Sequence, residues 1–231
     1  MIRNAVDSLV HLFFPHICAA CGSDVISKQQ LLCLACSDRL PLTNYHAFED
    51  NPVEKTFWGR LPLANASSYL YYNKDSIVQH LMHQFKYKGN REIGLYFGKK
   101  MGAEILASAR IKCPDLLVPL PLHSARMQKR GYNQAEILCQ GMAAELGIPV
   151  LASAITRKSQ TSTQTKQNRS SRWQNMEGRF EVRDRGRLEN RHVMLVDDVV
   201  TTGATLEACG HELIRAGGLI LSIATLAYTN T

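Results

Sequence analysis

The sequence contains no apolar run long enough to cross a membrane. Its longest uncharged apolar stretch, residues 217–228, has twelve residues, whereas a membrane-spanning helix needs about 20. The opening residues MIRNAVDSLVHLFF contain one Arg, place Asp7 and His11 inside the apolar run and are followed by no small-residue cleavage site. No signal peptide is therefore predicted, and we expect a cytoplasmic protein without a membrane partner.

Two glycine-rich nucleotide-binding motifs are also missing. Neither GxGxxG nor GxxxxGK followed by Ser or Thr occurs in the sequence, which disfavours a dinucleotide-binding fold and a P-loop NTPase. The composition, with 45% hydrophobic and 20% charged residues, excludes a disordered, collagen-like or coiled-coil chain. Because a domain has about 150 residues, the 231 residues predict one full domain with an accessory module.

Positive charge is in excess and unevenly placed. The chain has 27 Lys and Arg against 20 Asp and Glu. Residues 157–191 alone hold ten basic and four acidic residues, a surplus of six. A concentrated basic segment predicts a polyanionic partner, either a phosphorylated small molecule or a nucleic acid. A solvated basic surface is the alternative.

Four of the seven cysteines are clustered near the N-terminus. Cys18, Cys21, Cys33 and Cys36 form two C-x2-C pairs separated by eleven residues, a spacing with which four thiolates can surround Zn²⁺ tetrahedrally. Such a site has no open coordination position, so the zinc is predicted to be structural. A redox pair or buried free thiols are the alternatives, and disulfides are disfavoured without a signal peptide.

Helical and strand patterns alternate from about residue 75 onward. This alternation predicts a parallel sheet covered by helices on both faces. We expect a first domain over residues 1–66, made of a helix at 3–14, the zinc module and a connector at 40–66, and an α/β domain over residues 67–231. The expected helices lie at 76–89, 93–105, 133–147 and 206–213, and the expected strands lie at 116–120, 180–182, 193–196 and 219–227.

The strongest site signal is VMLVDDVVTTGAT at residues 193–205. A run that is apolar on both faces, typical of a buried parallel strand, leads into Asp197 and Asp198, and a small-residue loop at 201–205 then opens a helix. The N–H groups and dipole at such a helix start favour a phosphate. The two carboxylates would repel that phosphate, so they suit sugar hydroxyls, directly or around a hydrated Mg²⁺. One ligand with all three features is a ribose 5-phosphate derivative.

This segment resembles the motif with which type I phosphoribosyltransferases bind 5-phosphoribosyl 1-pyrophosphate (PRPP). The resemblance implies the fold of those enzymes, a parallel sheet with flanking helices, and a Mg²⁺ ion that accompanies PRPP. It implies that Asp197 and Asp198 are the catalytic residues that hold the ribose hydroxyls, while the loop wraps the 5-phosphate. The implied PRPP-binding residues are Asp197, Asp198, Val199, Thr201, Thr202, Gly203, Ala204 and Thr205.

Other segments are similar to the ComF/GntX family of competence-associated, phosphoribosyltransferase-like proteins. They are VPLPLHSARMQKRGYNQAEIL at 118–138, KYKG at 86–89, the cysteine pairs and the basic segment from Arg157 to Phe180. The resemblance runs from Cys18 to Thr205, with a departure at Gln167, where an apolar residue is usual. It implies a role in DNA uptake, with single-stranded DNA and a competence helicase as candidate partners.

Two loops are candidates for the pyrophosphate end of PRPP. The 119–131 loop follows a strand at the same sheet edge and carries Arg126, Lys129, Arg130 and Gly131; a loop at this place binds pyrophosphate in type I phosphoribosyltransferases, and a basic surface turn is the alternative. The polar stretch 157–178 is long enough to form a flexible lid, and its candidate ligand-binding residues are Arg157, Lys158 and Lys166. A disordered linker is the alternative there.

Two hypotheses about function follow. In the first, the protein is a pentosyl-transferring glycosyltransferase that binds Mg-PRPP and transfers the phosphoribosyl group to an unknown acceptor. Its acceptor pocket is then expected to come from residues 1–75 or from another chain. In the second, the protein is a non-catalytic competence factor that keeps the PRPP pocket and binds single-stranded DNA through the basic segment and the cysteine module.

Overall fold

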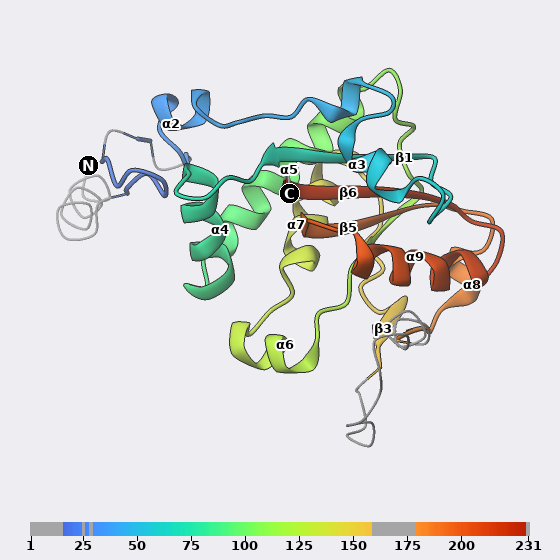
Figure 1. Cartoon of the computed structure of the whole chain (residues 1–231). Helices are drawn as coiled ribbons and strands as arrows, with labels where there is room; N and C mark the ends of the chain where they lie inside the picture. Colours follow the sequence, from blue (N-terminus) through green and yellow to red (C-terminus); the bar gives the residue numbers. More distant parts are fainter. Residues whose placement is uncertain (1–15, 25, 28–29, 159–178, 230–231) are drawn as a thin grey trace, which may run out of the picture.

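The core of the protein is a parallel sheet. In this computed structural model the described residues are 16–24, 26–27, 30–158 and 179–229. Four strands lie in the order β1–β6–β5–β2, and every neighbouring pair is parallel. The α/β class with a parallel sheet is confirmed (Figure 1). The strands of this sheet are β1 (Asn65–Tyr71), β2 (Leu116–Pro119), β5 (His192–Val200) and β6 (Ile220–Tyr228).

Helices cover both faces of the sheet. On one face, α4, α5 and α7 pack with Met194, Val196 and Leu226 in one apolar cluster. On the other face, α3 and α9 pack with Leu195 and Ile223 in a second cluster. The helices are α2 (Leu34–Asp38), the 3-10 turn η1 (Tyr45–Ala47), α3 (Pro52–Phe57), α4 (Ile77–Tyr87), α5 (Arg91–Ala107), α6 (Ser124–Arg130), α7 (Gln134–Leu146), α8 (Arg185–Leu188) and α9 (Ala204–Arg215).

A second, two-stranded sheet lies on the α9 side. It consists of β3 (Ile155–Arg157) and β4 (Phe180–Val182), which pair antiparallel. The strand expected at 180–182 is confirmed, whereas its partner β3 was not predicted. Phe180 joins the apolar cluster that contains Leu206 and Cys209 of α9, so this small sheet is held against the main domain.

Local capping sets the helix ends that the sequence predicts. The Ser76 hydroxyl accepts a hydrogen bond from the N–H of Gln79 at 3.2 Å, at the start of α4. The Asn133 side chain accepts one from the N–H of Ala135 at 3.1 Å, at the start of α7. Gly147 ends α7 with a φ of 68°, a conformation that glycine adopts without a Cβ penalty. Each cap satisfies backbone groups that a helix leaves unpaired.

Three predicted segments differ from the structure. Strand β5 does not stop at Val196 but continues to Val200, because β6 is equally long and pairs with it as far as Tyr228. The 119–131 loop contains the short helix α6. The connector predicted at 40–66 contains η1 and α3 and the first residues of β1. The helix expected at 3–14 lies outside the described residues.

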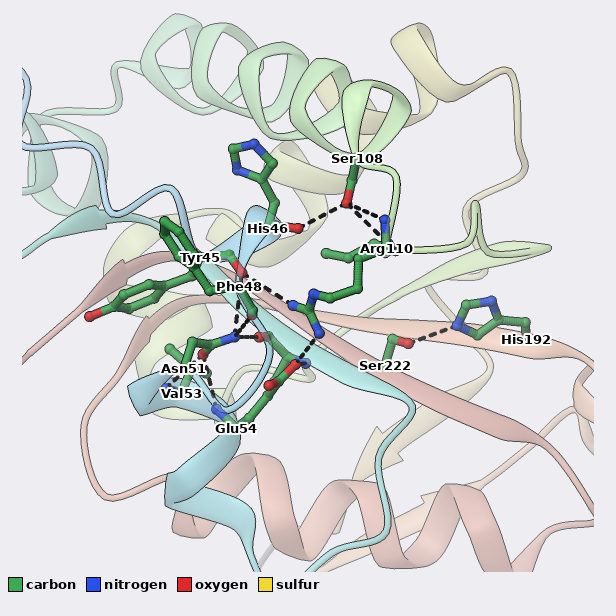
Figure 2. A network of polar contacts seen from close by, with 12 residues as sticks. Tyr45, His46, Phe48, Asn51, Val53, Glu54, Ser108, Arg110, His192 and Ser222 are labelled. Carbon is green, nitrogen blue, oxygen red and sulfur yellow. Dashed lines mark hydrogen bonds and ion pairs between the residues drawn. The ribbon is translucent and has the colours of Figure 1, made fainter.

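Hydrogen bonds fix the segment around α3 to the body of the protein (Figure 2). Arg110, which follows α5, pairs with Glu54 of α3 at 2.7 Å and donates to the Tyr45 carbonyl at 3.2 Å. The Asn51 side chain donates to the carbonyl of Ala66 in β1 at 2.9 Å and caps α3. These contacts connect α3 both to β1 and to the end of α5, so α3 is positioned on the sheet by residues far along the chain.

Helices α5 and α7 approach each other closely through glycines. A Cβ placed on Gly98 would lie 2.9 Å from the Cα of Gly141 and would also meet the carbonyl of Leu138. Glycine is therefore required at this crossing. With 17 residues, α5 is the longest helix in the described part of the chain, and no helix there has both the length and the apolar composition needed to cross a membrane.

Candidate functional site

Asp197 and Asp198 lie at the carboxyl edge of the sheet. Strand β2 ends at Pro119, whose register partner is Val196, so β5 carries the two acids just beyond the last residue of its neighbour. On its other side, β5 remains paired with β6, and Asp197 is opposite Thr225. This edge, outside the carboxyl ends of the strands, is where ligands bind in open α/β sheets.

The two carboxylates have different environments. The N–H of Asp198 donates to Oδ1 of Asp197 at 2.7 Å. Burial, followed by the neighbouring charge of Asp198, raises the pKa of Asp197 to about 8, although that hydrogen bond and the cations Lys86 and Arg126 lower it. The net effect favours the neutral form of Asp197. The environment of Asp198 is different, because a lysine pairs with its carboxylate.

Cations from two other elements meet Asp198. Lys86, in the last turn of α4, places its Nζ 2.9 Å from Oδ2 of Asp198. Arg130, at the end of α6, places Nη1 4.0 Å from the same oxygen, and the same nitrogen donates to Oε1 of Gln134 at 2.6 Å. Cations from α4 and α6 thus lie beside one carboxylate of β5. The role of Lys86 was missed, because the KYKG motif was noted only for its resemblance.

The loop at residues 201–205, here called the threonine loop, leads directly from β5 into α9. Thr201, Thr202 and Thr205 are exposed, while Gly203 is buried. Gly203 adopts a φ of 71° as the N-terminal cap residue of α9, and no side chain caps the helix there. The exposed side chains and the uncapped N–H groups at this helix start can together bind an anion. Of the other predicted PRPP-binding residues, Val199 lies in β5 and Ala204 begins α9.

The predicted pyrophosphate-binding residues lie on α6 and its last turn. Arg126 and Lys129 are exposed, and Gly131 ends the helix with a φ of 75°. With Arg130 near Asp198, the helix brings positive charge to the same edge as the acid pair. Figure 1 shows α6 projecting away from the sheet on the end of its two connecting segments.

The predicted lid residues are only partly described. Arg157 lies in β3 over the ring of Phe180, with its guanidinium carbon 5.5 Å from the ring centroid. Burial, then the charges of Arg179 and Arg126, lower the pKa of Arg157. Lys158 is exposed at the end of β3. Lys166 lies outside the described residues, as does most of the basic 157–178 stretch.

The four clustered cysteines converge as the spacing predicts. Their Sγ atoms all lie within 4.8 Å of one another. A ZnS₄ tetrahedron with Zn–S distances of about 2.3 Å has edges of about 3.8 Å, and the Sγ atoms of Cys21 and Cys33 are 3.8 Å apart. Burial raises the pKa of Cys18, but backbone N–H donors, including that of Cys33 at 3.3 Å, lower it to about 6 overall. The cluster can therefore hold a structural zinc ion.

The cysteine module packs against α4. Cys18 and Cys36 belong to the apolar cluster that contains Leu81 and Phe85 of this helix. The side chain of Gln84 donates to the carbonyl of Ala19, between the first two cysteines, at 2.6 Å. The helix that supplies Lys86 to the acid pair therefore rests on the cysteine module.

A family profile described as "Phosphoribosyl transferase domain" matches residues 132–231, which include the acid pair and the threonine loop. The fold and the site together define a domain of the phosphoribosyltransferase class. The chain belongs to the family of the DNA utilization protein YhgH and the competence proteins F and ComFC.

The relatives differ in how much of each chain is matched. The chain is 30% identical to YhgH of Escherichia coli K12 over 217 residues, 92% of this chain and 90% of that protein. It is 33% identical to YhgH of Salmonella typhimurium over 64% of this chain and 66% of that relative, slightly less than two thirds of its length. Competence protein F of Haemophilus influenzae is 37% identical over 47% of this chain and 48% of its own.

Solved structures were compared as well. Glutamine PRPP amidotransferase of B. subtilis is 18% identical, with a TM-score of 0.41, over 61% of this chain and 30% of its own. A hypothetical protein from Neisseria gonorrhoeae with bound ppGpp is 16% identical, with a TM-score of 0.41, over 61% of this chain and 69% of its own.

Proposed function

We propose that the protein binds Mg-PRPP at the carboxyl edge of β5 and transfers its phosphoribosyl group to an acceptor. The observation that supports this most is the sequence of features along β5 and α9. The acid pair is followed by an exposed loop that opens a helix, and α4 and α6 add cations beside the pair. The acids are complementary to a ribose diol, the loop to a 5-phosphate and the cations to a pyrophosphate.

Each group of the site has a role in this proposal. Asp197 and Asp198 hold the ribose hydroxyls by hydrogen bonds. The loop at 201–205 holds the 5-phosphate by its N–H groups. As the bond between C1 and pyrophosphate breaks and the acceptor's lone pair forms the new bond, Lys129 and Arg130 stabilise the negative charge on the departing pyrophosphate.

The acid pair is compatible with a magnesium ion that arrives with its ligand. Mg²⁺ usually binds through one or two carboxylates together with substrate phosphates. Asp198 offers two carboxylate oxygens, and Lys86 already partners one of them. When bound, the ion would neutralise charge on the pyrophosphate.

A ligand series tests the proposal. Calorimetric titration of the full chain with PRPP, ribose 5-phosphate, pyrophosphate and ribose, each with Mg²⁺, should give saturable binding for the first three, with PRPP the tightest. Ribose has neither charged group and should not bind measurably. A pyrophosphate-release screen of PRPP against bases, amines and nucleotides then identifies the acceptor. Absence of binding by both PRPP and ribose 5-phosphate contradicts the proposal.

A second candidate function is binding of single-stranded DNA. Tyr87 is 53% exposed at the end of α4. The ring of His83 lies 5.2 Å from it, and the cations of Lys129 and Arg130 lie 5.6 and 5.4 Å from its centroid. Aromatic rings among cations are what single-stranded nucleic acids contact. The names of the relatives, DNA utilization protein and competence protein, are consistent with this candidate.

Tyr87→Ala should weaken binding of a single-stranded oligonucleotide about tenfold, because one stacked base contributes about 1–3 kcal/mol. Wild-type affinity should fall steeply with salt. Phe48→Ala is a matched control, since Phe48 is similarly exposed, at 54%, on another part of the surface. Equal affinity of both variants, measured by fluorescence anisotropy at low salt, would remove this surface from consideration.

A further inference from the structure

The segment at α3 lies against the threonine loop, although about 145 residues separate them. A Cβ placed on Gly203 would be 2.7 Å from Cε1 of Phe57 and 3.0 Å from Cγ2 of Thr56. Phe57 is fully buried. The loop backbone therefore packs directly on α3, which the Arg110 and Asn51 hydrogen bonds fix to the rest of the protein.

Arg60, in the turn after α3, makes three contacts, with α3, with the loop and with α9. Its Nη1 donates to the carbonyl of Thr202 at 3.2 Å and to the carbonyl of Thr56 at 2.9 Å. Its Nη2 pairs with Oε2 of Glu207, in the first turn of α9. One guanidinium thus contacts both the loop and the helix that follows it.

The contact with Thr202 has a consequence for the loop's N–H groups. In a trans peptide the carbonyl of one residue and the N–H of the next point in opposite directions. A guanidinium that holds the Thr202 carbonyl therefore also fixes the direction of the Gly203 N–H. It turns the carbonyl, which would repel an anion, toward Arg60.

The contact with Glu207 has an electrostatic consequence. Glu207 is a mostly buried carboxylate, 13% exposed, in the first turn of α9. A negative charge there is favourable for the helix dipole but unfavourable for a phosphate bound at the same helix start. Arg60 compensates that charge within a partly buried pair, where screening by water is weak.

We propose that Arg60 is a positioning residue for the phosphate-binding loop. It directs the Gly203 N–H toward the ligand and cancels the charge of Glu207 beside it. This proposal rests on the proposed binding of a ribose 5-phosphate group. No motif of the loop itself includes Arg60, because the residue comes from the N-terminal third of the chain.

Calorimetry with ribose 5-phosphate tests the role of Arg60. Arg60→Gln should weaken binding about tenfold or more, because a hydrogen-bonded charge contributes about 1.5–3 kcal/mol. Glu207→Gln should bind at least as tightly as the wild type. The double variant Arg60→Gln with Glu207→Gln should bind more tightly than Arg60→Gln but less tightly than Glu207→Gln, because only the charge effect is relieved.

The double variant leaves no unpaired buried carboxylate. It should therefore fold, and its affinity can be measured, even if Arg60→Gln alone does not fold. Arg215→Gln is the control, since Arg215 pairs with Glu212 at 3.0 Å at the far end of the same helix. Folded Arg60 variants that bind ribose 5-phosphate as the wild type does would overturn this role for Arg60 and leave the proposed function standing. A wild-type chain that does not bind ribose 5-phosphate would instead count against the proposed function.

Discussion

Replacing both aspartates at the end of β5, Asp197→Ala with Asp198→Ala, should abolish measurable binding of Mg-PRPP. The double variant loses both carboxyl partners of the ribose hydroxyls. Hydrogen bonds to charged groups contribute about 1.5–3 kcal/mol each, and every 1.4 kcal/mol is about tenfold in affinity, so a loss of about 100-fold or more is expected. Calorimetric titration with Mg-PRPP measures it, and unchanged affinity would defeat the assignment of the acid pair.

The loss of the Asp197 carboxyl should not by itself unfold the chain. The pKa of Asp197 is raised to about 8 in the folded chain, so folding retains a proton there. The stability linked to that proton is complete below about pH 4, the unfolded pKa, and is lost as the pH rises toward the folded value. Removing Asp197 therefore removes a group that destabilises the fold at neutral and alkaline pH. Asp38→Ala, at an exposed carboxylate of α2, is a control that should bind like the wild type.

Cys36→Ser should lose the bound metal and much of the stability of the cysteine module. The wild type purified with reductant is expected to carry about one zinc per chain. Zinc bound by four thiolates contributes on the order of 10 kcal/mol of binding free energy to small modules, and Cys36 is buried in the cluster that contains α4. Metal analysis and thermal unfolding should therefore show little zinc and a clearly lower Tm.

The control for the metal prediction is Cys113→Ser. Cys113 is exposed and lies outside the cluster of four, so this variant should keep its zinc and its Tm. A metal-free wild type, or a Cys36→Ser variant with a full complement of zinc, would contradict the prediction.

Features encoded by neighbouring residues were predictable from the sequence. Helix caps and helix ends depend on contacts within a few residues, as at Ser76, Asn133 and Gly147. The acid pair and the loop that follows it are likewise continuous in the sequence. Strand β1 was not predicted, because Asn65, Ser67 and Ser68 are polar yet buried. The Ser68 carbonyl accepts a hydrogen bond from Thr43, and such long-range partners cannot be found by hydrophobic spacing.

The segment at 40–66 contained a helix signal that was not recognised. Asn51 followed by Pro52 is a favourable helix start, and α3 begins there, but the prolines favoured a connector. Lys86 and Arg60 could not be placed beside the site for a different reason. Each reaches its partner across more than 100 residues, and only the strand order and the packing of α3 and α4 bring them together.

The strand order also bears on how the protein folds during synthesis. Strand β6 lies between β1 and β5, although β1 is made about 150 residues earlier. Until residue 228 has left the ribosome, β1 lacks its sheet partner and the Val-Met-Leu-Val edge of β5 is uncovered. Such distant pairings slow folding, and an uncovered apolar edge promotes aggregation. The nascent chain is therefore most vulnerable just before β6 is complete, when a chaperone would have the greatest effect on yield.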